Sequence, residues 1–178
     1  MQICSMQKGT MGMKKVFTLA MVLCLCLALL AGCGGDSNHS YDVKSVVDQF
    51  VESYPVSMPG EINDDTLQDL MQIDLENVEE YYGYRCMAND NVDTVLMIKA
   101  KAGSADAVKE ALEAYRDNME ASCNMYNDAE ATKAKNALIT VKGDYLLLTM
   151  SGDSAEIEAG KMETIKADIQ KKVDELLK

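Results

Sequence analysis

Cysteine and histidine are the residues of this chain best suited to chemistry, and their positions limit what that chemistry can be. The sequence has six cysteines and one histidine. The histidine, His39, lies in a polar stretch from Gly34 to Ser40, and a short polar segment is a poor place to hold a catalytic base. The sequence has no Cys-x-x-Cys pair and no set of residues that suits zinc. We therefore expect a protein that is not an enzyme and has no metal site.

Cys33 closes a pattern that is typical of an exported chain. Met13-Lys14-Lys15 precedes an apolar run from Val16 to Leu30, which is long enough to enter a translocon but short for a helix that spans roughly 30 Å of hydrocarbon. Leu30-Ala31-Gly32-Cys33 then matches the bacterial lipobox at every position. The match implies cleavage between Gly32 and Cys33 and a covalent diacylglycerol on Cys33, on the outer face of the cytoplasmic membrane. The alternative is a plain transmembrane anchor with a cysteine there by chance.

These signals divide the chain into three parts. Residues 1–32 form the predicted signal peptide, and we expect translation to start at Met13, or at Met11, because residues 1–12 fit poorly as an extension of the basic n-region. Residues 33–40 give the lipid anchor and a polar tether, and residues 41–178 give a single extracytoplasmic domain.

The charge of the chain limits its partners. The formal net charge is −12 for the whole sequence. The leader holds Lys8, Lys14 and Lys15 and no acid, so the part from Cys33 onward has 14 basic and 29 acidic residues, a net charge of −15. Such a field repels phosphate backbones, which argues against nucleic acid as a partner. Solubility is the simpler reason for this acidity.

Helices are predicted at the start of the domain. Apolar residues recur at helical spacing from Val43 to Tyr54, and Ser40 or Asp42 can cap the start of that helix. A second short helix is predicted from Asp64 to Met71, and Asp74 is a candidate N-cap for one further turn.

Strands and helices alternate in the rest of the domain. A strand pair precedes a long amphipathic helix that begins at Gly103-Ser104, and a second pair, joined at Gly143-Asp144, precedes a last helix capped by Asp153. The expected fold is α+β: a four-stranded antiparallel sheet (ββαββα order) with two helices on one face, preceded by two or three short N-terminal helices. Tyr145–Met150 is apolar on both faces, so we expect a central strand whose second face is covered by the N-terminal helix or by a partner. The predicted strands are 80–88, 94–102, 137–142 and 145–150, and residues 127–136 form a polar connection.

Cys86 and Cys123 are the two cysteines that follow the lipobox. An even pair outside the cytoplasm favours a disulfide, and both residues could face the same layer, since Cys86 lies on a predicted strand and Cys123 on the apolar side of the long helix. Two buried free thiols are the alternative.

The loop between the first two strands has alternating oxygen ligands, as a calcium loop has. Asn89, Asn91 and Asp93 supply them, but Thr94 stands where such a loop needs glycine, and no bidentate glutamate follows at the required position. A polar hairpin turn explains the same residues better.

Adjacent acids and a group of tyrosines complete the candidate residues. Acids such as Glu79-Glu80 point to different sides of an element, so they do not form the facing pair that glycoside hydrolysis needs. On the first strand, alternation places Tyr82 and Tyr84 on one face and Tyr81 on the other. The edge of the core is the expected place for these rings, and a binding surface is the alternative.

Several segments of the domain together resemble a known family. They are Asp74-Leu75-Glu76 to Tyr82, Val95 to Lys101, Tyr126, and Asn136-Ala137 to Gly143-Asp144-Tyr145. They are similar to a small extracytoplasmic domain of Gram-positive lipoproteins that is known only as a domain of unknown function. The resemblance covers Glu61 to Met150 and implies a Gram-positive source and the same lipid anchor, but no activity, ligand or site.

We expect a membrane-anchored, non-enzymatic binding or accessory module that engages another envelope protein or a wall component through its sheet or the edge of the sheet. The alternative is a small-ligand-binding lipoprotein that feeds a transporter. Against that alternative, the 146 residues from Cys33 onward are few for a two-lobed clamp.

Overall fold

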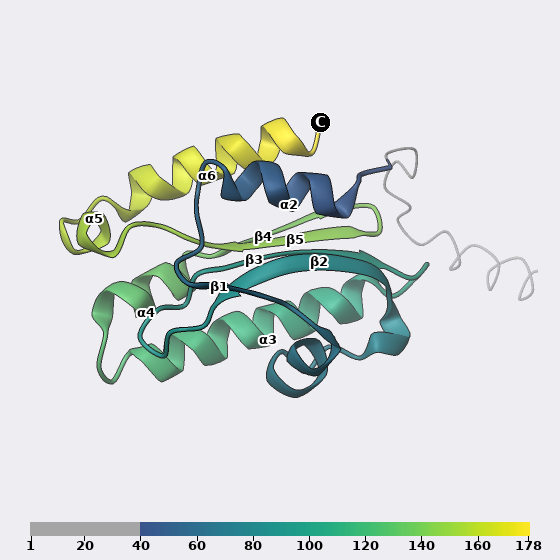
Figure 1. Ribbon diagram of the computed structural model, residues 1–178, viewed down its shortest axis with the longest axis horizontal. Coiled ribbons are helices and arrows are strands. Elements are labelled where there is room, and N and C mark those ends of the chain that lie inside the picture. The colour runs from purple at the N-terminus through teal and green to yellow at the C-terminus, as the bar shows by residue number, and fades with distance from the viewer. Residues whose placement is uncertain (1–39) are drawn as a thin grey trace, which may run out of the picture. The chain divides into compact units, whose positions relative to one another are not determined.

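A computed structural model gives the structure of residues 40–178 (Figure 1). The predicted signal peptide, the cleavage site at Gly32 and Cys33, and most of the tether lie outside the described residues. In chain order the elements are α2 (Val43–Val51), β1 (Pro59–Glu61), η1 (Thr66–Leu70), η2 (Leu75–Asn77), β2 (Val78–Cys86), β3 (Thr94–Ala100), α3 (Ala105–Cys123), α4 (Asp128–Lys135), β4 (Leu138–Lys142), β5 (Tyr145–Met150), α5 (Ser154–Glu158) and α6 (Met162–Leu176).

The N-terminal helix forms where the valine pattern predicts it. The Asp42 side chain caps α2 by accepting a hydrogen bond of 2.8 Å from the Ser45 N–H, which satisfies one of the free donors of the first turn. The apolar stripe, which includes Val43, Val47 and Phe50, is fully buried, so packing rather than intrinsic propensity holds this short helix. The capped turn predicted after Asp74 is also present, as η2.

The sheet of the described domain has five antiparallel strands in the order β1-β2-β3-β5-β4, so the prediction of four strands is wrong. The four predicted strands are all present, and β5 lies inside the sheet between β3 and β4, as its two apolar faces require. The additional strand, β1, pairs with the end of β2, where Pro59 lies opposite Cys86. Pro59-Gly60 reads as a loop signal in the sequence, but an edge strand tolerates proline because one side of it needs no donor.

The two longest helices, α3 and α6, lie on opposite faces of the sheet (Figure 1). The prediction that both cover one face is therefore wrong. On one face α3 packs against alternate residues of β3 and β5, among them Leu96 and Leu148. On the other face α2 and α6 pack together against the intervening residues, among them Met97 and Leu147. The physical reason is that β3 and β5 are apolar on both sides, so each face must be covered. The prediction that the N-terminal helix covers the second face is confirmed.

Gly83 allows β2 and β3 to lie close together. A Cβ atom at this position would lie 2.4 Å from the Val95 carbonyl oxygen and 2.8 Å from the Leu96 Cα. Both are backbone atoms of the neighbouring strand, so they cannot move aside as a side chain could. The sheet therefore requires glycine here.

The structure divides the last helical segment into two helices. Asp153 caps α5 as predicted, since its carboxylate accepts 2.9 Å from the Glu156 N–H. Glu156 does not reach back to complete a capping box but pairs with Lys161 at 3.0 Å. Gly160, with φ of +77°, ends α5 before α6 begins. No helix within residues 40–178 is long and apolar enough to span a membrane.

Candidate functional site

The structure separates the two cysteines that the sequence left open to a disulfide. Cys86 belongs to the hydrophobic cluster beneath α2 and α6, whereas Cys123 belongs to the cluster beneath α3. Both are buried free thiols, so the disulfide does not form in this structure. The sheet lies between the two clusters, so the expectation that both cysteines face the same layer is wrong. Burial raises the pKa of the Cys123 thiol, and a hydrogen bond from Tyr126 acts in the opposite direction.

The tyrosines of β2 point as their alternation predicts. Tyr82 and Tyr84 pack on the α2 side of the sheet, and Tyr81 packs on the α3 side. The hydroxyl oxygens of Tyr82 and Tyr84 are 2.6 Å apart, and the Lys44 ammonium lies 4.6 Å from the centre of the Tyr82 ring. The hydrogen bond to Tyr82, with burial second, raises the pKa of Tyr84 to about 12. These rings form the edge of a core.

The oxygen atoms of the loop between β2 and β3 are engaged within the protein. The Asn91 Oδ1 accepts 2.7 Å from the Asp93 N–H, and Val92 is buried in the core beneath α3. Asp93 turns inward toward Lys133. This loop is a hairpin connection held by its own side chains. Among residues 40–178, no cluster of three or more acidic, histidine or cysteine side chains is placed to hold a metal ion.

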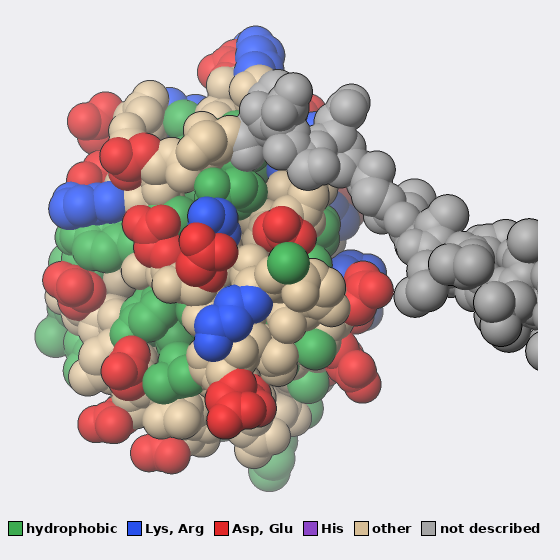
Figure 2. All heavy atoms as spheres, turned by 90° about the vertical axis from the view of Figure 1, so that its right-hand side faces the viewer, with side chains coloured by type: hydrophobic (Ala, Val, Ile, Leu, Met, Phe, Trp, Pro, Cys, Tyr) green, Lys and Arg blue, Asp and Glu red, His purple; other side chains and the backbone are tan. Residues whose placement is uncertain are grey.

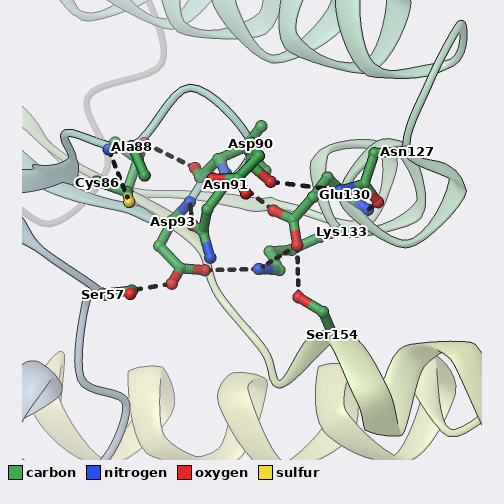
Figure 3. Close-up of polar contacts among 12 residues, drawn as sticks. Ser57, Cys86, Ala88, Asp90, Asn91, Asp93, Asn127, Glu130, Lys133 and Ser154 are labelled. Atoms are coloured by element: carbon green, nitrogen blue, oxygen red, sulfur yellow. Dashed lines mark hydrogen bonds and ion pairs between the residues drawn. The ribbon is translucent and has the colours of Figure 1, made fainter.

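Three charged side chains meet in the interior of the domain and form what we term the buried ion cluster: Asp93, Glu130 and Lys133 (Figure 3). The Lys133 Nζ lies 2.8 Å from the Asp93 Oδ1 and 3.0 Å from the Glu130 Oε1. The side chains of Lys133 and Glu130 are 0% and 1% exposed, and that of Asp93 is 8% exposed. Charged side chains are almost never buried to this degree unless they are paired, and here two carboxylates share one ammonium.

Neighbouring polar groups from three segments of the chain complete the cluster. The Glu130 Oε2 accepts 2.8 Å from the Val92 N–H, and its Oε1 accepts 2.5 Å from the Ser154 hydroxyl at the start of α5. The Asp93 Oδ2 accepts a longer hydrogen bond, 3.4 Å, from the Ser57 N–H in the connection between α2 and β1. The cluster therefore links α4, α5, the β2–β3 loop and the connection between α2 and β1 (Figure 3).

The sequence predicts a polar connection over 127–136, and the structure places α4 there instead, capped by Asn127 at 3.1 Å from the Glu130 N–H. The buried side of α4 consists of small alanines together with Glu130 and Lys133. Because charged residues occupy core positions of α4, its apolar residues do not recur at helical spacing, and the sequence pattern is that of a solvent-exposed segment. The signal that could have indicated this helix is the cap Asn127 with Glu130 three residues on.

A second feature lies at the edge of the sheet, which we term the β1 edge surface. Met58 and Met87 are 65% and 57% exposed and flank Pro59, and the Met87 N–H donates 3.1 Å to the Met58 carbonyl. Gly60 leaves room for the Met87 side chain, since a Cβ there would be 2.4 Å from the Met87 Sδ. Pro59 also borders a groove of about 310 Å³. The groove is lined by Asp48, Val51, Pro55, Val56, Pro59 and Tyr84.

This surface suits contact with another molecule better than strand addition. It has exposed apolar side chains beside a mainly apolar groove, and exposed apolar patches mark interaction sites more often than isolated apolar residues do. The strand β1 has only three residues and begins with proline, so it offers few free backbone groups to a partner strand. The exposed part of this edge is therefore formed mainly by side chains rather than by free backbone groups.

The fold and these features define a small α+β domain in which neither face of the sheet is open. The family described as Domain of unknown function (DUF4358) matches residues 52–151, and the chain belongs to this family. That range includes the segment over which the sequence resembles a domain of unknown function. No curated protein and no solved structure matches the chain.

Proposed function

We propose that this chain is a lipid-anchored lipoprotein of a Gram-positive bacterium, whose extracytoplasmic domain is a non-enzymatic binding or accessory module for another envelope component. The observation that carries the proposal is the lipobox Leu30-Ala31-Gly32-Cys33, placed after a basic start and an apolar run and just before a polar tether. The diacylglycerol on Cys33 is the only covalent group that the proposal requires.

The length of the tether limits where the partner lies. Residues 34–40 are seven in number, and at full extension each spans at most about 3.6 Å, so the tether reaches about 25 Å. The chain enters the folded domain at α2. A domain on such a short tether meets components that project from, or lie on, the same membrane. We therefore propose a membrane-associated envelope protein as the partner.

The β1 edge surface is the proposed contact. Methionine side chains are flexible and adapt to apolar groups of different shape, which suits Met58 and Met87 to a docking role. Glu61 is exposed on β1 and forms no salt bridge within the described residues, and Arg85 of the neighbouring strand donates to the Met87 Sδ at 3.5 Å. The net charge of −15 from Cys33 onward favours a partner segment that carries lysine or arginine beside apolar side chains.

Acidic side chains are spread out on one face of the molecule. On the face shown in Figure 2, acidic side chains are scattered among basic, apolar and other groups rather than gathered in one patch. This distribution agrees with a general role in solubility, and it leaves the β1 edge surface distinguished by its apolar side chains rather than by charge alone.

Site-specific photo-crosslinking in intact cells tests this proposal. A photo-reactive residue at position 58 should capture one membrane-associated protein through a segment that contains apolar and basic residues. The matched control is position 141, because Val141 is 38% exposed on β4, the opposite edge of the sheet. Capture from position 58 should fall when Met87→Ser is added, and position 141 should give none of the same product. Equal capture from both positions, or none from position 58, would contradict the proposed contact.

A further inference from the structure

The buried ion cluster holds an amine and a carboxyl group in direct contact. The Lys133 Nζ lies 2.8 Å from the Asp93 Oδ1, and neither side chain is appreciably exposed to water. The two residues are 40 positions apart in the chain, so the fold alone brings them together. When a fold holds two reacting groups together away from water, a slow bimolecular reaction becomes a unimolecular one.

From this geometry we propose that Lys133 and Asp93 condense to form a side-chain amide, an isopeptide bond between α4 and the β2–β3 loop, with Glu130 as the proton carrier. The Lys133 ammonium and the Asp93 carboxylate yield one amide and one water molecule, with no change in total charge and no oxidant or reductant. The atoms needed are all within the cluster.

The steps follow from the positions of the groups. One proton passes from the Lys133 ammonium to the Asp93 Oδ1 through Glu130, which leaves a neutral amine beside a neutral carboxyl. The Lys133 Nζ attacks the Asp93 Cγ, and negative charge develops on Oδ2, to which the Ser57 N–H makes only a long contact of 3.4 Å. Glu130 takes a proton from the attacking nitrogen and delivers it to the Oδ1 hydroxyl. The bond from Cγ to Oδ1 then breaks, water leaves, and Glu130 is a carboxylate again, with the Val92 N–H and the Ser154 hydroxyl as its hydrogen-bond donors.

Glu130 is built for the role of proton carrier. Its Oε1 lies 3.0 Å from the Lys133 Nζ, within reach of the proton that must move. The Val92 N–H and the Ser154 hydroxyl hold its two oxygens at 2.8 and 2.5 Å, so the carboxylate cannot rotate away from the amine. Asp93 is fixed in turn by its backbone, since the Cys86 N–H donates 2.7 Å to the Asp93 carbonyl.

Peptide mass analysis of the full chain, purified from membranes and denatured before digestion, tests the bond. We expect a linked peptide that joins Asp93 to Lys133 and is lighter than the sum of its two parts by one water molecule. Recovery of the two peptides only as separate, unmodified species would overturn the proposal. The wild-type protein gives this answer by itself, so the test does not depend on any variant folding.

Two variants test the assignment of roles. Asp93→Asn should give a linked peptide of the same mass as the wild type, because ammonia leaves in place of water and the amide product is identical. A link to Glu130 instead, which lies nearly as close to Lys133, would overturn Asp93 as the acyl partner. Glu130→Gln should slow formation at least ten-fold, since acid–base catalysis by a positioned group contributes about 10²–10⁴-fold. Equally fast linkage in Glu130→Gln, with the fold retained by circular dichroism, would remove Glu130 from the mechanism.

Discussion

At the residue scale, the buried lysine is the feature with the largest consequence for stability. Lys133 is fully buried and contacts two carboxylates that have lost their water. Removing one member of such a cluster leaves uncompensated charge in the interior, which costs far more than the net value of the interaction. The folded state therefore depends on all members of the cluster being present, whatever the net contribution of the cluster to the free energy of unfolding.

Lys133→Met should lower the free energy of unfolding by at least about 3–5 kcal/mol, because it removes the cation that Asp93 and Glu130 share and, with it, the amine of the proposed amide. Urea unfolding followed by circular dichroism measures this loss. Lys109→Met is the matched control, since Lys109 pairs with Glu113 on the exposed surface of α3 and should cost under about 0.5 kcal/mol. A loss in Lys133→Met no larger than in the control would show that the cluster is not buried as described.

The thiols give a second prediction at this scale. Cys86 and Cys123 should both react with a thiol reagent in the denatured, unreduced protein, because the two lie in separate clusters. In the native protein Cys123 should react more slowly than a small thiol at the same pH, since its burial and its raised pKa both reduce the accessible thiolate. Failure to detect either thiol after denaturation would indicate a disulfide and contradict the structure.

At the scale of elements, periodicity in the sequence was enough to find every element whose buried side is apolar. The stripes of α2 and α3, the strand pairs and the Asp42, Asp74 and Asp153 caps could all be read directly. What could not be read was α4, because its buried side carries charge, and β1, because Pro59-Gly60 is a turn signal whose pairing depends on tertiary contacts. The missed elements also supply the candidate sites, in the buried ion cluster and at the β1 edge surface.

The close approach of β2 and β3 predicts a cost for one added methyl group. Gly83→Ala should lower the free energy of unfolding by about 1–3 kcal/mol, because the new Cβ meets backbone atoms of β3. Thermal unfolding measures this change, and Glu79→Ala, on an exposed position of the same strand, provides the control. A Gly83→Ala protein as stable as the wild type would mean that the strands can separate locally without cost.

The tyrosines of β2 predict how stability depends on alkaline pH. Burial, with a hydrogen bond to Asp64 second, raises the pKa of Tyr81 to about 12, and the pKa of Tyr84 is raised to about 12 as well. Unfolded tyrosine loses its proton near pH 10, so between pH 10 and 12 the unfolded state binds fewer protons than the folded state. Stability contributed by these two groups is therefore complete below pH 10 and is lost as pH rises toward 12.

Urea unfolding at a series of pH values measures this decline. The double variant Tyr81→Phe, Tyr84→Phe should lose stability more gradually over the same range, because it has two fewer groups to ionise on unfolding. An identical pH dependence in the variant and the wild type would show that these hydroxyls are not protected by the fold.

At the scale of the whole molecule, the fold class could be read from the sequence but the layering could not. The pattern gives an α+β domain with antiparallel strands, because strand and helix periods alternate along the chain. Whether α3 and α6 share a face depends on which residues of β3 and β5 each helix meets, and strands that are apolar on both sides do not reveal this. The same ambiguity led to the expectation of a cysteine pair in one layer.

The central claim at this scale is the proposed lipid anchor on Cys33, which would hold the domain on the outer face of the membrane. Metabolic labelling of growing cells with a fatty-acid probe, followed by purification of the protein, tests it most directly. We expect label on the wild-type protein and none on Cys33→Ser. A wild-type protein without label, or a Cys33→Ser protein labelled to the same extent, would contradict the account.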